Sequence, residues 1–195
     1  MSSEVAGPVV VDSWAEKSVV KNVTLVLGLT LFTALCAQVS VPLPFTPVPL
    51  TLQTFAVLAG AAALGAERSV IAQVIYVVLA VAGAPVLAGG ASGMSSITGP
   101  TGGYIVGFVA ASYVVGRIAE RGATRQVVAT VSSYVAGTAV IYVLGVSWLS
   151  FATHMSVRDA IVAGMIPFLI GDALKALAAG AALPSAWKLT GSASK

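Results

Sequence analysis

Residues 167–183 have the sequence PFLIGDALKALAAGAAL, which places an aspartate and a lysine inside an apolar run long enough to cross a membrane. Asp172 and Lys175 are three residues apart, so on a helix they lie on one face, together with Phe168, Gly171 and Ala179. Each charge near the bilayer centre costs roughly 2.5 to 3.5 kcal/mol, so the pair must neutralise itself or hold a ligand. We predict a binding site here; the alternative is a structural ion pair that fixes the last helix to its neighbours.

The composition excludes a soluble domain. Of the 195 residues, 57% are hydrophobic and only 9% are charged, and the mean hydropathy is +0.97. The chain is too short for two ordinary domains, and its apolar residues form several long runs. We therefore predict an all-α membrane protein whose outer surface contacts membrane lipid. The single Cys36 cannot form an internal disulfide.

The apolar runs predict six transmembrane helices, at residues 23–41, 50–66, 69–88, 103–116, 127–146 and 160–183. The predicted domains are a tail at 1–21, a transmembrane substrate-binding domain at 22–184 and a second tail at 185–195. Only Arg158 lies on one side of the predicted membrane, and Lys175 lies within it. The other eight basic residues share the opposite side: Lys17, Lys21, Arg68, Arg117, Arg121, Arg125, Lys188 and Lys195. Basic loops favour the cytoplasm, so both termini are predicted to be cytoplasmic.

The first outer loop, VPLPFTPVPL at residues 41–50, is rich in proline. Prolines at this density fix φ and remove backbone donors, so the loop is predicted to be extended and stiff rather than helical. A stiff loop that also carries an aromatic residue suits a lid over a cavity; a plain spacer is the alternative. The lid residues are Pro42, Pro44, Phe45 and Pro47, with Pro49 at the end, and Thr51, Gln53 and Thr54 follow where they could reach the same cavity.

The second outer loop, GAPVLAGGASGMSSITGPTGGY at residues 83–104, has seven glycines and no charge. Glycine lets the backbone approach a ligand closely and use its amide groups for binding. A nucleotide-binding loop is excluded, because no lysine in the chain follows a glycine. Its apolar residues and Tyr104 favour re-entry into a protein-lined cavity over a flexible outer connector.

The sequence contains little that indicates a catalytic function. His154 is the one histidine, has no acidic partner nearby in sequence and is interpreted as a solvated loop residue. No cluster has metal-ligand spacing, so we predict no metal and no cofactor. Membrane topology accounts for the basic residues, so nucleic acid is not expected as a partner.

Four ordered motifs between Lys21 and Leu183 resemble the BioY family, the biotin-binding S components of energy-coupling factor (ECF) vitamin transporters. The motifs are VPLPFTPVPLTLQT, then GAPVLAGGASG with GPTGGY, then IYVLGVSWL, and finally GDALK. The resemblance implies a six-helix bundle in the plasma membrane of a prokaryote that captures biotin from outside. It also implies a transmembrane T protein and two cytoplasmic ATPases as partners, with no enzymatic activity in this chain.

The resemblance also implies roles for individual residues. The acidic and basic pocket pair falls on Asp172 and Lys175, and the aromatic residue after the Gly-rich loop falls on Tyr104. An amide is expected in that loop, where this sequence has Ser92, Ser95 and Ser96 instead, and Ser92 is the candidate chosen. The other candidate substrate-binding residues are Gln53, Gly99, Gly102 and Gly103.

Small residues four apart in the first helix allow close packing of another helix, either from this chain or from a partner. They are Thr30 with Ala34 and Thr33 with Ala37. The resemblance implies docking of the T protein through such a motif, and Thr33 with Ala37 is the nearest match. Other functions stay open: an S component for another vitamin, a self-sufficient proton-coupled carrier that uses Asp172, or a structural subunit without a ligand.

Overall fold

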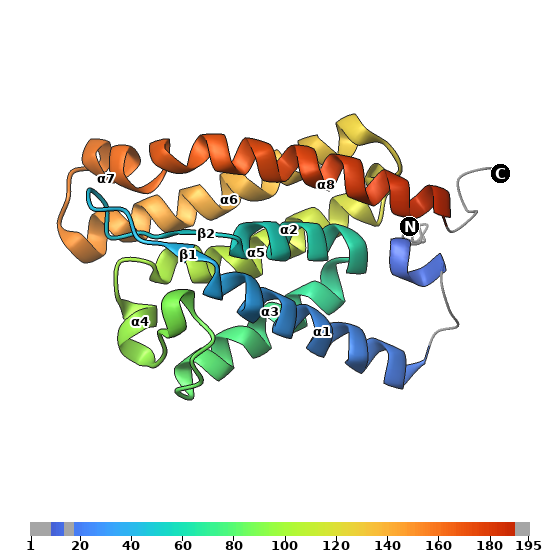
Figure 1. The fold of residues 1–195 in the computed structure, drawn as a ribbon, viewed down its shortest axis with the longest axis horizontal. Helices are drawn as coiled ribbons and strands as arrows, with labels where there is room; N and C mark the ends of the chain where they lie inside the picture. The colour runs from blue at the N-terminus through green and yellow to red at the C-terminus, as the bar shows by residue number, and fades with distance from the viewer. Residues whose placement is uncertain (1–8, 14–17, 190–195) are drawn as a thin grey trace, which may run out of the picture.

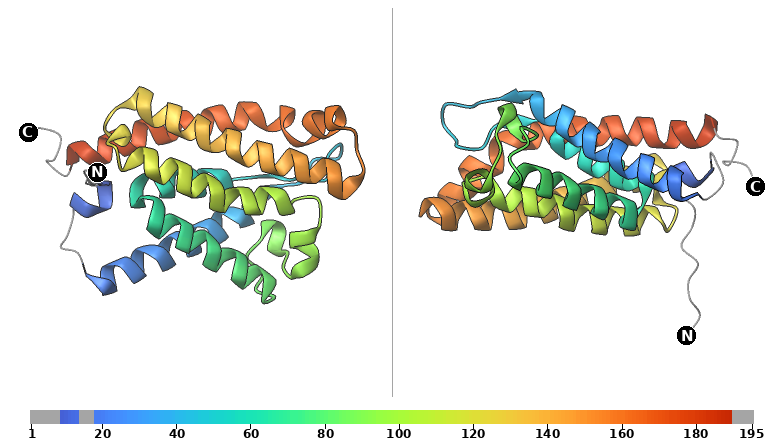
Figure 2. Two further views of the ribbon diagram at one scale, coloured as in Figure 1. Left: turned by 180° about the vertical axis from the view of Figure 1, so that it is seen from behind. Right: turned by 90° about the horizontal axis from the view of Figure 1, so that it is seen from below.

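The computed structural model describes residues 9–13 and 18–189, and the described chain is mostly helical (Figures 1 and 2). A two-stranded antiparallel hairpin pairs β1 (Ser40–Val41) with β2 (Leu50–Thr51). The 3-10 turn η1 (Val10–Ser13) precedes the first described helix, and η2 (Ala88–Gly90), η3 (Ala123–Arg125) and η4 (Ile166–Phe168) lie between helices. The α-helices are α1 (Val19–Gln38), α2 (Gln53–Leu64), α3 (Ala66–Val81), α4 (Met94–Thr98), α5 (Gly102–Ala119), α6 (Val127–Thr153), α7 (Val157–Gly164) and α8 (Leu169–Leu189).

The long helices form an elongated bundle with α5 inside it, in contact with α2, α3 and α6. The hairpin, α4 and α7 lie at one end of this bundle (Figure 1). Turn η1, the start of α1 and the end of α8 lie at the other end (Figure 1). The described chain therefore begins and ends at the same end of the bundle, opposite the two unusual loops.

The surface of the bundle is apolar, as a bilayer requires. Helices α1, α6 and α8 expose large apolar side chains, including Leu27, Leu31, Leu35, Val135, Val143, Ile170, Leu174 and Leu177. Small residues such as Ala56, Ala61 and Ala111 are fully buried instead, which lets the helices approach closely. Four segments are long and apolar enough to cross a membrane: α1, α5, α6 and Val157–Lys188. The structure thus supports an all-α membrane protein, and α2 and α3 are shorter, at 12 and 16 residues.

The last predicted helix, 160–183, is interrupted in the structure. Helix α7 ends at Gly164, η4 carries Pro167, and α8 starts at Leu169 and continues to Leu189. A Cβ at Gly164 would lie 2.2 Å from the Tyr104 hydroxyl, so the chain turns where only glycine fits. Helix α6 is longer than predicted and ends at Thr153, and His154 follows it as an exposed residue, as expected.

The structure extends the bundle into both predicted tails, at 1–21 and 185–195. Val9 and Val11 are buried in the main core, and η1 contacts α2 and α8. The Asp12 carboxylate lies 2.9 Å from the Arg68 guanidinium, and α1 begins at Val19 rather than after residue 21. At the other terminus α8 includes residues 185–189. Residues 1–8, 14–17 and 190–195, with Lys17 and Lys195, lie outside the described residues.

The small residues of α1 face another helix of this chain, so the docking prediction for this face is not supported. Thr30, Thr33 and Ala37 are buried within the bundle, and the two threonines face α3. The Thr30 hydroxyl donates to the Ala72 carbonyl at 3.0 Å, and the Gln73 amide donates to the Thr33 hydroxyl at 3.1 Å. Ala34 is half-buried and packs beside a second core cluster. A partner would therefore have to contact a different surface.

This packing predicts the effect of enlarging Ala37, whose exposed fraction is 0%. Ala37→Trp should destabilise the isolated protein by about 1–3 kcal/mol or more, because the tightly packed surroundings of a fully buried alanine have no room for an indole ring. The melting temperature in detergent should fall by several degrees relative to wild type. Leu31→Trp is the matched control, since Leu31 is 61% exposed on the same helix. Equal melting temperatures for the two variants would contradict the buried placement of Ala37.

Candidate functional site

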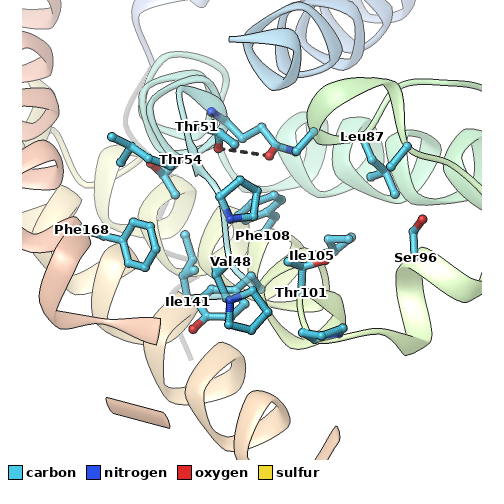
Figure 3. A pocket seen from close by; sticks show the side chains of 18 of the residues that line it. Val48, Thr51, Thr54, Leu87, Ser96, Thr101, Ile105, Phe108, Ile141 and Phe168 are labelled. Carbon is cyan, nitrogen blue, oxygen red and sulfur yellow. Dashed lines mark hydrogen bonds between the residues drawn. The ribbon is translucent and has the colours of Figure 1, made fainter. Parts of the chain in front are cut away.

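A cavity of about 270 Å³ lies at the end of the bundle that carries the hairpin and α4. Its walls come from α2, α5, α6 and α8 and from both loops that the sequence singled out. Figure 3 shows the apolar part of the wall, which includes Val48, Ile105, Phe108, Ile141 and Phe168. A mostly apolar cavity with a few polar groups is typical of a small-molecule site, and this volume suits a ligand at or below the ~300 Å³ lower end of such sites.

The predicted ion pair lies in this cavity. Lys175 Nζ and Asp172 Oδ1 are 3.0 Å apart, and their side chains are only 11% and 9% exposed. Asp172 falls in the first turn of α8, where the helix dipole favours a negative charge. Phe168 and Ala179, which the predicted stripe places beside this pair, are both buried.

Two other helices complete the hydrogen bonding of this pair. Lys175 Nζ donates to the Thr54 hydroxyl of α2 at 2.8 Å, and that hydroxyl lies 3.3 Å from Asp172 Oδ1. The Tyr142 hydroxyl of α6 donates to Asp172 Oδ2. Both carboxylate oxygens therefore accept hydrogen bonds, which offsets part of the cost of burying the charge. Among these contacts Lys175 uses two of its three N–H groups, and the third can serve a ligand.

The amide of Gln53 forms a second polar position, 6% exposed at the start of α2. Its Nε2 donates to the Tyr76 hydroxyl at 2.6 Å, and its Oε1 accepts from the Thr51 hydroxyl at 3.1 Å, which is the bond drawn in Figure 3. Thr51, Gln53 and Thr54 all line the cavity. The prediction that the polar start of the second helix reaches the cavity is therefore confirmed.

The Gly-rich loop enters the protein-lined cavity, as predicted, through Gly99 but not through Ser92, Gly102 or Gly103. Gly99 lines the cavity together with Ser95 and Ser96. Ser92 does not, and its carbonyl accepts a hydrogen bond from the Ser96 hydroxyl at 2.9 Å. Of the three serines that stand in place of the expected amide, Ser95 and Ser96 thus lie at the cavity and Ser92 does not.

Gly102 and Gly103 have a packing role rather than the predicted ligand role. A Cβ at Gly103 would lie 2.2 Å from Cβ of Trp148, and one at Gly102 would lie 1.8 Å from the Ile97 carbonyl oxygen. The absence of side chains lets α5 start directly against α6. The Trp148 indole N–H then donates to the Gly99 carbonyl at 2.9 Å, which holds this part of the cavity wall.

Tyr104 lines the cavity. Its hydroxyl donates to the Gly164 carbonyl at 2.8 Å and so holds the end of α7. Tyr142 and Phe108 also line the cavity, and neither is among the residues predicted for the site. A tyrosine in an apolar helix needs a hydrogen-bond partner for its hydroxyl, and that was the available signal for Tyr142.

The Pro-rich hairpin covers the cavity with its returning half, residues 47–51. Of the four predicted lid residues only Pro47 lines the cavity. Pro42 and Pro47 border a neighbouring hollow of about 370 Å³, and Phe45 is 65% exposed near the tip. The extended, non-helical form of the loop is as predicted.

Comparisons with known proteins agree with this architecture. The model of the BioY family matches residues 8–192. The biotin transporter BioY of Thermotoga maritima is 40% identical over 152 residues, which cover 76% of this chain and 87% of the relative. The probable biotin transporter BioY of Pyrococcus horikoshii is 37% identical over 159 residues, covering 82% and 91%. Among solved structures, the S-component for biotin from an ECF-type ABC transporter superposes with a TM-score of 0.81 at 25% identity, covering 89% of this chain and 95% of that one. The chain therefore belongs to the BioY family.

Proposed function

We propose that this chain is the biotin-binding S component of an ECF-type importer, and that it captures biotin without hydrolysing ATP itself. The observation that carries the proposal is the buried Asp172–Lys175 pair in an otherwise apolar cavity. The names of the relatives and the likeness to a biotin S-component support the choice of ligand.

The cavity offers groups that match biotin. The ureido ring has two N–H donors and one carbonyl acceptor, which a carboxylate and an ammonium can satisfy together. Asp172 supplies the acceptor and Lys175 the donor, and Thr54 holds them together. The bicyclic ring and the aliphatic chain suit the apolar wall formed by Phe108, Ile141 and Phe168. Lys175 can serve either the ureido oxygen or the valerate carboxylate.

The proposed setting is the cell membrane of a prokaryote, with six crossings, cytoplasmic termini and the cavity open to the outside. Basic side chains support this orientation, because Arg68 and Arg125 engage η1 and the end of α8, far from the cavity. Arg158 lies instead in α7, at the cavity end. A transmembrane T component and two cytoplasmic ATPases would drive inward release, as the ECF context of the solved neighbour suggests.

Removal of the carboxylate charge tests the ligand site. Asp172→Asn should weaken biotin binding roughly 10- to 100-fold, because a hydrogen bond to a charged group contributes about 1.5–3 kcal/mol and Lys175 loses its partner. Calorimetric titration of the purified protein measures the change. Asp159→Asn is the control, since Asp159 is an exposed residue in the first turn of α7. Wild-type affinity in Asp172→Asn would make the pair structural.

The same titration separates the rival functions. Tighter binding of riboflavin or thiamine than of biotin would assign the chain to another vitamin. Uptake by the purified chain alone in liposomes under a pH gradient would favour a proton-coupled carrier.

Thiol labelling tests the orientation. Cysteine placed at Ser95, which is exposed beside the cavity, should react with an impermeant thiol reagent in intact cells, and biotin should slow the reaction. Cysteine placed at Ala123, in η3 at the opposite end, should react only after the cells are broken. The native Cys36 is 8% exposed and should contribute little background. Labelling of Ala123→Cys in intact cells would reverse the orientation.

A further inference from the structure

The hydroxyl of Tyr76 connects two walls of the cavity from behind. Tyr76 lies on α3, is 0% exposed and does not itself line the cavity. Its hydroxyl accepts a hydrogen bond from Gln53 Nε2 at 2.6 Å and donates one to the Val86 carbonyl at 2.9 Å. One side chain thus joins the start of α2 to the start of the Gly-rich loop.

This chain of hydrogen bonds has a direction. A backbone carbonyl can only accept, so the Tyr76 hydroxyl must use its single proton on Val86. The Tyr76 oxygen then acts as an acceptor towards Gln53, which fixes the NH₂ group of the amide on the Tyr76 side. The Gln53 carbonyl oxygen consequently lies on the opposite side, where the Thr51 hydroxyl donates to it at 3.1 Å.

The amide retains capacity for a ligand in this orientation. A carbonyl oxygen accepts two hydrogen bonds, and Thr51 occupies one of these positions on Gln53. Without the Tyr76 hydroxyl the amide could rotate by 180° and present N–H groups in place of the oxygen. The identity of the group that Gln53 offers to the cavity therefore depends on a residue outside the cavity.

We propose that Tyr76 is a positioning residue that holds Gln53 with its carbonyl oxygen available to an N–H donor of the ligand. The inference rests on the proposed function, because a ureido N–H of biotin is such a donor. A merely structural tyrosine would stabilise the fold without acting through Gln53. A double-mutant cycle on ligand affinity distinguishes the two roles.

The test compares Tyr76→Phe, Gln53→Leu and the double variant with wild type by calorimetric titration with biotin. Tyr76→Phe keeps the ring and removes only the hydroxyl. It should weaken binding about five- to tenfold in the wild-type background and less than about twofold in the Gln53→Leu background. Tyr113→Phe makes the same chemical change at a residue that is 57% exposed, and should leave the affinity unchanged.

Gln38→Leu controls for anchoring of the loop. The Gln38 amide donates to the carbonyl of Leu87, the residue after Val86, at 3.3 Å and forms no hydrogen bond with Gln53. Removal of the Gln38 amide should therefore change the affinity for biotin less than about twofold. A loss equal to that of Tyr76→Phe would assign the effect to the loop and overturn the role of Gln53. Unchanged affinity in Tyr76→Phe, or an equal effect in both Gln53 backgrounds, would also overturn the proposal.

The proposed function and this inference fail in different ways. If the wild-type protein does not bind biotin, both are overturned. If wild type binds biotin and Tyr76→Phe binds it equally well, the inference fails and the proposed function stands. Melting temperatures of the ligand-free variants report separately on folding, and a lower melting temperature with unchanged affinity would make Tyr76 structural.

Discussion

The cost of burying charge in an apolar medium organises the functional end of this protein. Asp172 and Lys175 form an ion pair at a mostly apolar cavity, with side chains only 9% and 11% exposed, so each offsets part of the cost of burying the other's charge. The pair recruits Thr54 from α2 and Tyr142 from α6, so three helices converge on one carboxylate and one ammonium. The hydrogen-bonding groups that offset the cost of burying this ion pair also define where a polar ligand can bind. A mostly apolar, preorganised site with a few polar groups of this kind suits a small molecule.

The remaining walls of the cavity are built from backbone that side chains hold in place. The Gly-rich loop has little side-chain volume of its own, yet three of its carbonyls accept hydrogen bonds from Tyr76, Gln38 and Trp148. The Pro-rich hairpin needs fewer such contacts, because proline limits its φ angles and the short strand pairing closes its base. One wall is thus stiff through covalent geometry, and the other through hydrogen bonds from the bundle.

The opposite end of the bundle is closed by contacts that the apolar pattern does not reveal. Val9 and Val11 fill a position next to α2 and α8, and Asp12 pairs with Arg68. The Trp187 indole donates to the Thr124 hydroxyl while the Arg125 guanidinium lies over its ring. Basic residues at this end therefore also hold terminal segments on the bundle, in addition to the role in topology that their distribution suggests.

The sequence by itself determined the membrane class, the approximate helices, the two loops and the buried pair, because each depends on local features: hydropathy over a span, proline or glycine density, and spacing along one helix. Gln53 and Tyr104 were also predicted near the cavity from their position beside those loops. Only the tertiary structure decided which small residues face a neighbour within the chain, as Thr33 and Ala37 do, and which glycines serve packing, as Gly102 and Gly103 do. It also placed Tyr142 on Asp172, 30 residues away in the chain. Contacts of this kind depend on the relative rotation and depth of packed helices, and no periodicity within a single segment encodes these quantities.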